Sequence, residues 1–505
     1  MIPGIGSWLT KRTILTPDKE AVVDGEKRLT YRQLNGRVNR LAKALQFLGL
    51  KSGDRLSILS TNCVEYVETI MAAAKLGVLL VPLNWRLTPT ELTFILKDSG
   101  TETLLFHPDL LETAAIVREK AGLKRMVVLG SEERGGAFAY EQIVEPLNDD
   151  EPAPDVLPGL DTPHIIMYTA GTTGQPKGAV LTQGTAFWNA VNLTVSMDFT
   201  SRDRNLAVLP MFHIGGIGLF TLPMLYMGGT VVIQRTFEPA QTLELLESEG
   251  ITLFFGVAAI FLFLIQHPQF KGEAFEKVRV VMSGGAPLPV SLVHQYHEAG
   301  IILQQGFGMS EAAPSIATLE KALAIQKAGS IGKALMHVEA RVVNDEMVNM
   351  PVDQVGELVI RGPNLMQSYW NRPEATEEAF SGGWFHTGDL ARMDRDGDIY
   401  IVERKKDMFI SGGENVYPAE VENAIYELPQ ISEVAVIGIK DEKWGEVGKA
   451  VVVLKEGQEI TRENIIGYLK GRLAKYKIPK NVVFTGPLPR NAAGKVLKKV
   501  LREEN

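Results

Sequence analysis

The sequence predicts an α/β protein with a large N-terminal domain and a small C-terminal domain. Three observations predict this fold. Between residues 21 and 305, short apolar runs bounded by Gly, Pro or Asp alternate with amphipathic stretches, which is typical of parallel-sheet α/β subdomains. From about Val338, segments alternate apolar and polar residues with little helix between them, which indicates a β-rich subdomain. Beyond Lys406 a smaller α+β unit begins.

The first part of the chain carries two series of expected strands, separated by a Pro- and Asp-rich loop or linker at Asp149–Asp161. The strands expected in the first series are Ala21–Val23, Arg55–Leu59, Val78–Pro82, Thr103–Phe106 and Arg125–Leu129. Helices are expected between some of them, over Tyr31–Leu48 and Glu65–Leu76. The second series is Ile165–Tyr168, Asn205–Leu209, Thr230–Ile233, Leu253–Gly256, Val278–Ser283 and Ile302–Gln305. The most apolar stretch, Ile251–Ile265, is shorter than the roughly 20 residues that span a bilayer, so we expect a core strand followed by a core helix.

The β-rich subdomain is expected to contain strands at Val338–Val343, Gly356–Arg361 and Ile399–Val402. The C-terminal unit is expected to contain strands at Val434–Ile437 and Ala450–Leu454 and helices at Pro418–Leu428 and Arg462–Leu473. The predicted domains are therefore 1–405 and 406–505.

The amino-acid composition excludes some classes of function. The chain has 505 residues and a formal net charge of −8, which disfavours a general nucleic-acid binder. A single cysteine, Cys63, rules out an intramolecular disulfide and fits a reduced, cytoplasmic setting. We expect Cys63 to be a small buried residue, and Met1–Thr10 shows no secretory signal.

The clearest functional pattern is T-A-G-T-T-G-Q-P-K-G, residues 169–178, which follows an expected buried strand. Glycines let a backbone approach a ligand closely, and consecutive amides, hydroxyls and a lysine form an anion-binding concavity. The candidate phosphate contacts are Thr169, Gly171, Thr172, Thr173, Gly174 and Lys177. The P-loop pattern does not fit, because Pro176 stands where its second glycine should be.

This segment resembles the signature loop of the adenylate-forming superfamily, which includes acyl-CoA synthetases, firefly luciferase and peptide-synthetase adenylation domains. Members usually carry Ser where this chain has Ala170. Six further motifs follow in matching order, so the resemblance extends from about Asp18 to Glu503. It implies a small C-terminal domain that is mobile about a hinge.

The resemblance implies roles for the middle motifs. In L-P-M-F-H, His213 lines the acyl pocket and positions the acid. In S-G-G-A-P-L, Gly284, Gly285 and Ala286 form one side of the adenine and acyl site. In Q-Q-G-F-G-M-S-E, Phe307 replaces the usual Tyr as the face that stacks on adenine, next to Gly308. Ser310 and Glu311 lie near the α-phosphate and Mg²⁺, for which oxygen ligands are suited.

The later motifs complete the implied site. Asp389 of T-G-D accepts the ribose hydroxyls, and Arg404 of E-R-K-K-D reaches the ribose or the phosphates. Lys406 is the implied hinge. Gly412 and Gly413 leave room for the pantetheine arm of coenzyme A, and Lys495 assists adenylation. Lys498 and Lys499 are expected to be solvated surface charges.

The implied function is an acyl-CoA ligase with ATP, Mg²⁺ and coenzyme A. A carboxylate attacks the α-phosphorus of ATP, pyrophosphate leaves, and the acyl group then passes to coenzyme A with release of AMP. By resemblance the pocket comprises His213, Gly216, Val257–Ile260, Gly284 and Gly308–Ala313, which are small and apolar without Arg or Lys. A medium- or long-chain fatty acid is expected, with o-succinylbenzoate second and aryl acids third.

Rival interpretations stay open at this point. They are an adenylation enzyme that loads a carrier protein, a luciferase-like oxygenase and a non-catalytic nucleotide-binding protein. No nucleic-acid partner is expected. A homodimer and a peripheral contact with a membrane are both compatible with the sequence.

Overall fold

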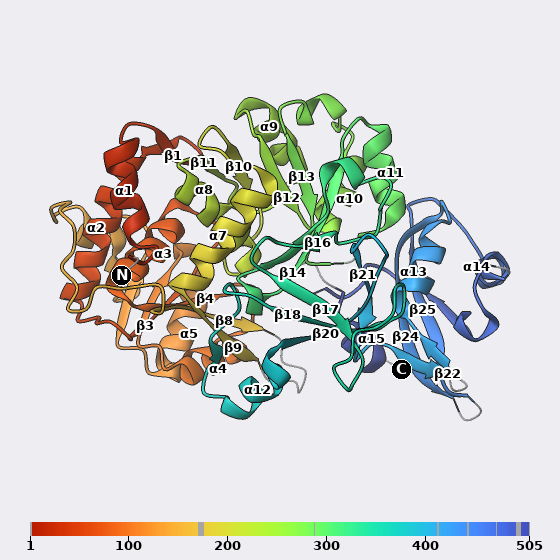
Figure 1. Ribbon diagram of the computed structural model, residues 1–505. Helices are drawn as coiled ribbons and strands as arrows, with labels where there is room; N and C mark the ends of the chain where they lie inside the picture. Colours follow the sequence, from red (N-terminus) through yellow and green to blue (C-terminus); the bar gives the residue numbers. More distant parts are fainter. Residues whose placement is uncertain are drawn as a thin grey trace.

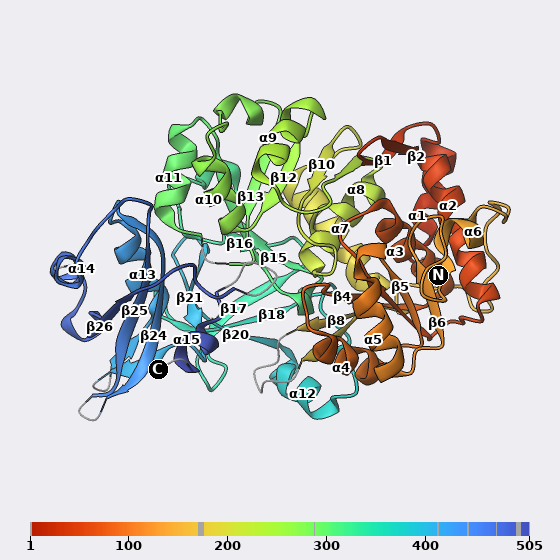
Figure 2. The same ribbon diagram turned by 180° about the vertical axis from the view of Figure 1, so that it is seen from behind.

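A computed structural model describes residues 3–169, 176–286, 288–411, 414–441, 444–470, 472–490 and 496–503. These residues build four β-sheets with helices packed against them (Figure 1), and Figure 2 shows the same arrangement from behind. The last sheet and its helices, blue in Figure 1, form a separate unit at one end of the molecule.

One sheet is formed by the first strand series. Its order in space is β19 (Ser368–Tyr369), β9 (Lys177–Thr182), β8 (Pro163–Thr169), β4 (Leu79–Leu83), β3 (Arg55–Leu59), β5 (Thr103–Phe106), β6 (Arg125–Val128) and β7 (Phe138–Ala139). The pairs from β8 to β7 are parallel, whereas β8 with β9 and β9 with β19 are antiparallel. The late strand β19 thus brings residue 369 beside the segment that follows the phosphate loop.

A second sheet is formed mainly by the second series. Its order is β16 (Lys333–Ala334), β15 (Ser315–Thr318), β14 (Leu303–Gly308), β13 (Val280–Ser283), β12 (Leu253–Gly256), β10 (Arg204–Ala207), β11 (Thr230–Ile233), β1 (Glu20–Asp24) and β2 (Lys27–Thr30). The strands from β14 to β1 pair in parallel. The parallel α/β expectation is therefore confirmed.

The helices of this part cover the sheets and bury their apolar faces. They are α1 (Ser7–Leu15), α2 (Tyr31–Phe47), α3 (Val64–Leu76), α4 (Pro89–Ser99), α5 (Leu111–Ala121), α6 (Tyr140–Val144), α7 (Gln183–Met197), α8 (Thr221–Met227), α9 (Pro239–Ser248), α10 (Ala258–Gln266), α11 (Val290–Glu298) and α12 (Pro373–Ala379). Local side-chain hydrogen bonds set where several of these helices begin. At the start of α2 the Thr30 hydroxyl accepts the Gln33 backbone amide, and the Gln33 side chain accepts the Thr30 backbone amide. Residues 149–161 form no helix or strand, as expected of a loop.

The expected β-rich subdomain is an antiparallel sheet of β17 (Glu339–Val343), β18 (Gly356–Arg361), β20 (Phe385–Met393) and β21 (Ile399–Arg404). The C-terminal unit contains β22 (Phe409–Ser411), β23 (Glu414–Val416), β24 (Ile431–Asp441), β25 (Gly445–Leu454) and β26 (Asn481–Phe484). Its helices are α13 (Pro418–Tyr426), α14 (Arg462–Leu469) and α15 (Lys498–Glu503). The predicted boundary at 405/406 falls in the turn between β21 and β22.

The predicted ends of several helices and strands differ from the observed ends by a few residues. The helix expected at 462–473 stops at Leu469, because Lys470 takes an extended backbone conformation. Each unit has its own core, and that of the C-terminal unit includes Phe409, Val436 and Leu469. No helix built by the described residues is long and apolar enough to cross a bilayer.

Candidate active site

The phosphate loop joins two antiparallel strands. Thr169 ends β8 and Lys177 begins β9; the two residues are register partners, and the Thr169 hydroxyl donates to the Lys177 carbonyl over 3.4 Å. The ammonium of Lys177 lies 5.4 Å from the ring centroid of Tyr369, a cation–π distance. The predicted contacts between these ends (Gly171, Thr172, Thr173 and Gly174) lie outside the described residues, as does Ala170.

Glu311 lies beside the same tyrosine. Ser310 and Glu311 belong to a 3₁₀ turn, Ser310–Ala312, that follows β14. The Glu311 carboxylate is buried and accepts a hydrogen bond from the Tyr369 hydroxyl over 2.9 Å. Burial and the charge of Glu311 raise the pKa of Tyr369, so the phenol stays protonated and donates. The fold thus brings Lys177 and Glu311 together through a tyrosine that the motif comparison did not select.

Two buried asparagines hold the turn that carries Glu311. The side-chain amide of Asn364 donates to the carbonyls of Ala312 (2.9 Å) and Ser315 (2.8 Å). Asn189 of α7 accepts from the Ser315 amide over 3.1 Å and donates to the Gly218 carbonyl. Since buried hydrogen bonds hold the backbone in one conformation, these residues restrain the turn that carries the Glu311 carboxylate.

The predicted adenine wall lies at the carboxyl ends of β13 and β14, where ligands of open α/β sheets bind. Gly284, Gly285 and Ala286 follow β13, whereas Phe307 and Gly308 end β14. Close packing also requires glycine at two of these positions, which the sequence alone does not reveal. A Cβ at Gly308 would lie 2.0 Å from the Pro314 carbonyl oxygen, and one at Gly284 would lie 2.8 Å from that of Gly306.

The predicted ribose residues contact each other. The Arg404 guanidinium pairs with the buried Asp389 carboxylate at 2.7 Å, across the register pair that joins β20 and β21. The positive charge of Arg404 also acts on Tyr369, where it opposes the rise in pKa. Asp389 and Arg404 are therefore electrostatic neighbours of the Glu311 cluster.

His213 is a neutral, buried histidine. Burial and the charge of Arg86 lower its pKa to about 4, and among the described residues its Nε2 has no hydrogen-bond partner. Arg86, from the loop after β4, lies 4.8 Å from the Trp85 ring and 5.8 Å from the Phe212 ring. The residues expected to line the pocket contain no Arg or Lys, but Arg86, which is far away in sequence, brings a positive charge close to His213.

Residues of the hinge region have mixed outcomes. Lys406 is exposed in a turn whose amide at Asp407 donates to the Arg404 carbonyl over 2.9 Å. Gly412, Gly413 and Lys495 lie outside the described residues. The expectation for Lys498 is wrong: its side chain is only 14% exposed, because its ammonium pairs with Glu422 at 2.9 Å and with Glu403 at 3.5 Å. Lys499 is 72% exposed, as predicted.

Other features of the described residues do not belong to this site. The carboxylates of Asp394, Asp396 and Asp398 lie close together, but the Lys327 ammonium already pairs with all three. Cys63 is half-buried, and burial raises the pKa of its thiol.

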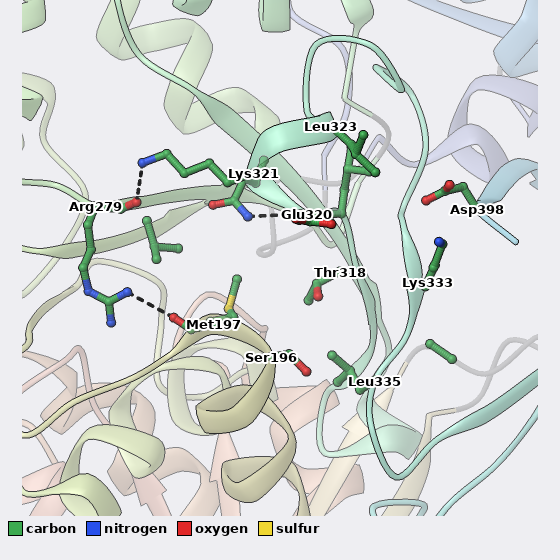
Figure 3. A pocket seen from close by; sticks show the side chains of 14 residues that line it. Ser196, Met197, Arg279, Thr318, Glu320, Lys321, Leu323, Lys333, Leu335 and Asp398 are labelled. Carbon is green, nitrogen blue, oxygen red and sulfur yellow. Dashed lines mark hydrogen bonds between the residues drawn. The ribbon is translucent and has the colours of Figure 1, made fainter. Parts of the chain in front are cut away.

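A cavity of about 490 Å³ lies at the opposite end of β13 and β14 (Figure 3). It contains none of the predicted site residues, and two of its three cationic side chains already have partners: Lys321 donates to the Arg279 carbonyl, and Arg279 pairs with Asp203. This cavity is therefore not the reaction centre.

Known proteins share the whole arrangement. A model of the AMP-binding enzyme family matches residues 10–370, and a model of the AMP-binding enzyme C-terminal domain matches residues 420–495. This chain belongs to the AMP-binding enzyme family. The adenylate-forming resemblance is therefore confirmed, and the chain is an ATP-dependent, AMP-forming ligase of the acyl- or aryl-CoA class.

Three relatives and one solved structure illustrate the range within the family. A feruloyl-CoA synthase of Amycolatopsis sp. is 42% identical over 99% of this chain and 98% of its own length. An indoleacetate–CoA ligase of Aromatoleum aromaticum and the long-chain-fatty-acid–CoA ligase FadD13 of Mycobacterium tuberculosis are each 39% identical over the same shares. ATP-bound MatB of Rhodopseudomonas palustris superposes with a TM-score of 0.91 at 30% identity, covering 100% of this chain and 99% of that one. Its apo form gives 0.81 at 31% identity with the same coverage.

Sequence reasoning missed four residues of the site: Asn189, Asn364, Tyr369 and Arg86. Tyr369 had a usable signal, since the aromatic pair Tyr369-Trp370 stands in a polar loop just before Asn371-Arg372-Pro373. The two asparagines and Arg86 had none, because the partners that matter lie at least 29 residues away in sequence and approach them only in the fold.

Proposed function

We propose that this ligase activates a short aryl carboxylic acid, of the arylpropenoate or arylacetate type, in place of the fatty acid that the sequence alone favours. The observation that carries this proposal is the surroundings of His213. The Phe212 ring lies 4.7 Å from the imidazole, and Arg86, whose charge acts on His213, lies near the rings of Phe212 and Trp85. An aromatic ring with polar substituents finds stacking and hydrogen-bonding partners there, whereas an alkyl chain gains nothing from a guanidinium.

The size of the space beyond the pocket supports a short acid. The cavity lined by Leu209, Gly216, Phe220 and Phe255 measures about 10 Å³. That is room for about one water molecule. A long alkyl chain would have to displace these side chains, and the backbone is closely packed there, since a Cβ at Gly216 would lie 2.3 Å from the Pro210 carbonyl oxygen.

The relatives support the same class. Feruloyl-CoA synthase and indoleacetate–CoA ligase are named for aryl acids, and both match this chain over nearly its full length. A fatty acid is the second candidate, because FadD13 matches at 39% identity. The 2-succinylbenzoate–CoA ligases, at 36% identity or less, are a third.

In the first half-reaction, the proposed work of the protein is positioning and charge stabilisation. Lys177 and the loop 169–178 neutralise the leaving pyrophosphate, and Lys495 stabilises charge that develops at the α-phosphate. The His213 imidazole, which is neutral at neutral pH, donates from Nε2 to the acid. Asp389 and Arg404 hold the ribose.

The residues around Glu311 fit a magnesium ion. Tyr369 bonds one carboxylate oxygen of Glu311, and a carboxylate has a second oxygen to offer to a hard cation that also binds waters and phosphates. The Ser310 hydroxyl is the other proposed ligand. The ion, when bound, supplies positive charge that stabilises the phosphate oxygens.

In the second half-reaction, coenzyme A must reach the acyl carbon, so we propose that residues 406–505 rotate about Lys406. The whole chain superposes on ATP-bound MatB with a TM-score of 0.91 and on its apo form with 0.81, which supports the proposal that the present orientation is the one that uses ATP. Gly412 and Gly413 are the proposed neighbours of the pantetheine arm.

The experiment is an acid panel scored by coenzyme A-dependent release of AMP, with ferulate, indoleacetate, decanoate, palmitate and 2-succinylbenzoate as substrates. We expect the highest kcat/KM for an aryl acid, and a preference for palmitate would overturn the proposal. Lys495→Ala should remove most acid-dependent pyrophosphate exchange. Lys406→Pro should spare that exchange and block thioester formation; equal loss of both would refute the hinge.

A further inference from the structure

Glu403 connects the two sides of the proposed hinge. It is the second-last residue of β21, three positions before Lys406, and it is 8% exposed. One carboxylate oxygen accepts the amide of Arg404 over 2.9 Å. The other accepts the amide of Ala419 in α13 over 3.0 Å and faces the ammonium of Lys498 at 3.5 Å. Both of these last partners lie beyond the hinge.

Lys498 has a second acidic partner that lies on its own side of the hinge. Glu422 of α13 pairs with it at 2.9 Å and also accepts the Val436 amide over 2.7 Å. Burial alone would lower the pKa of Lys498, but the two carboxylates outweigh it and raise that pKa. The ammonium is therefore firmly charged where it meets Glu403.

The chain positions of these partners have a direct consequence. A rotation about Lys406 moves α13 and α15 relative to β21, so it carries Ala419 and Lys498 away from Glu403. The pair between Lys498 and Glu422 moves as one body and survives. Only Glu403 changes its surroundings, and a buried carboxylate that loses its cation and an amide donor is destabilised.

From this arrangement we propose that Glu403 is a positioning residue that selects the ATP-using orientation of the C-terminal domain. It acts through Lys498 and Ala419, not on the substrate. Lys498 is three residues after Lys495 in the sequence. The inference rests on the proposed hinge and adds to it the contact that biases its equilibrium.

The primary test measures domain orientation without relying on activity. Donor and acceptor dyes are attached at cysteines introduced for Lys120 and Glu463, which are exposed on α5 and α14. Glu403→Gln keeps the side-chain shape but removes the charge. We expect it to shift the ratio of the two orientations by about tenfold away from the ATP-using one, the effect of losing one charge-assisted hydrogen bond.

The matched control is Glu427→Gln. Glu427, a glutamate of the C-terminal domain, likewise has a cationic neighbour, Arg472, but its side chain is 57% exposed. We expect no change in orientation. Glu403→Asp, which restores the charge, should recover part of the wild-type distribution.

The two half-reactions give the second readout. Glu403→Gln should slow acid-dependent pyrophosphate exchange about tenfold while leaving thioester formation from supplied acyl-adenylate unchanged or faster. If wild type exchanges pyrophosphate and Glu403→Gln matches Glu427→Gln in both readouts, the inference is overturned. If wild type shows no exchange with any acid, the proposed function fails instead. Equal loss of both half-reactions would mean that Glu403 is merely structural.

Discussion

Removing the hydroxyl of Tyr369 tests whether the fold, and not the motif alone, positions Glu311. In Tyr369→Phe the ring remains beside Lys177, but the 2.9 Å bond to the Glu311 carboxylate is lost. Glu311 is 7% exposed, so water replaces this donor poorly. A hydrogen bond to a charged group is worth about 1.5–3 kcal/mol.

If Glu311 must be held in place in the transition state, this energy appears in the rate. Each 1.4 kcal/mol is about a factor of ten, so acid-dependent pyrophosphate exchange should fall by about 10- to 100-fold. The magnesium concentration for half-maximal rate should rise, because a freely rotating carboxylate is a weaker ligand.

The chain offers a matched control. Tyr468 makes the same kind of bond to Glu427 over 2.7 Å, but on an exposed surface of the C-terminal unit. Tyr468→Phe should therefore change the exchange rate by less than about twofold. Equal rates for the two variants, with unchanged magnesium dependence, would refute the argument that Tyr369 positions Glu311.

Three further predictions concern stability, measured by urea unfolding. Lys498→Met should lower the free energy of unfolding by about 3–5 kcal/mol because two buried carboxylates lose their cation, whereas Lys499→Met should lower it by under about 0.5 kcal/mol. The loss in Lys498→Met should shrink at acid pH, where Glu422 becomes protonated because its pKa is raised, and a loss that does not vary with pH would contradict this account. The pKa of His213 is lowered in the folded protein, so its contribution to stability is present above the unfolded-state pKa of about 6.5 and is lost as the pH falls toward 4. His213→Asn should therefore remove up to about 3 kcal/mol of the acid-induced loss of unfolding free energy, and equal slopes of unfolding free energy against pH in the two proteins would argue against a neutral imidazole. Gly308→Ala should lower the free energy of unfolding by more than about 2 kcal/mol because the added Cβ meets the Pro314 carbonyl. Gly467 is exposed in α14 with open space around it, so Gly467→Ala should be neutral or stabilising by about 0.5–1 kcal/mol.

Local patterns predicted much of the fold. Strands such as Thr103–Phe106, Thr230–Ile233 and Gly356–Arg361 were predicted with the ends that the structure has. Their boundaries are set by neighbouring turn residues and by the period of their own apolar side chains, both of which are local properties. Helix ends were less accurate, as at Leu469, because the last turn depends on backbone geometry that side-chain patterns do not reveal.

Ordered motifs predicted the family and the position of most site residues. Thr169 and Lys177 flank the loop, Asp389 meets Arg404, and Glu311 lies near Lys177, as a shared nucleotide site requires. The motifs around Gly284 and Phe307 could be placed in this way because they lie at the carboxyl ends of neighbouring parallel strands, whereas Asp389 and Arg404 lie in an antiparallel sheet.

Only the tertiary structure decided what surrounds these residues. Arg86 approaches His213 from the loop after β4, and Tyr369 reaches Glu311 because β19 pairs with β9. Lys498 is buried between two glutamates from β21 and α13. A lysine in a basic tail resembles a solvated charge until its partners are known, since its burial depends on carboxylates 76 and 95 positions away in sequence. Local chemistry therefore determined the reaction class, whereas long-range pairing determined the surroundings of His213, Glu311 and Glu403.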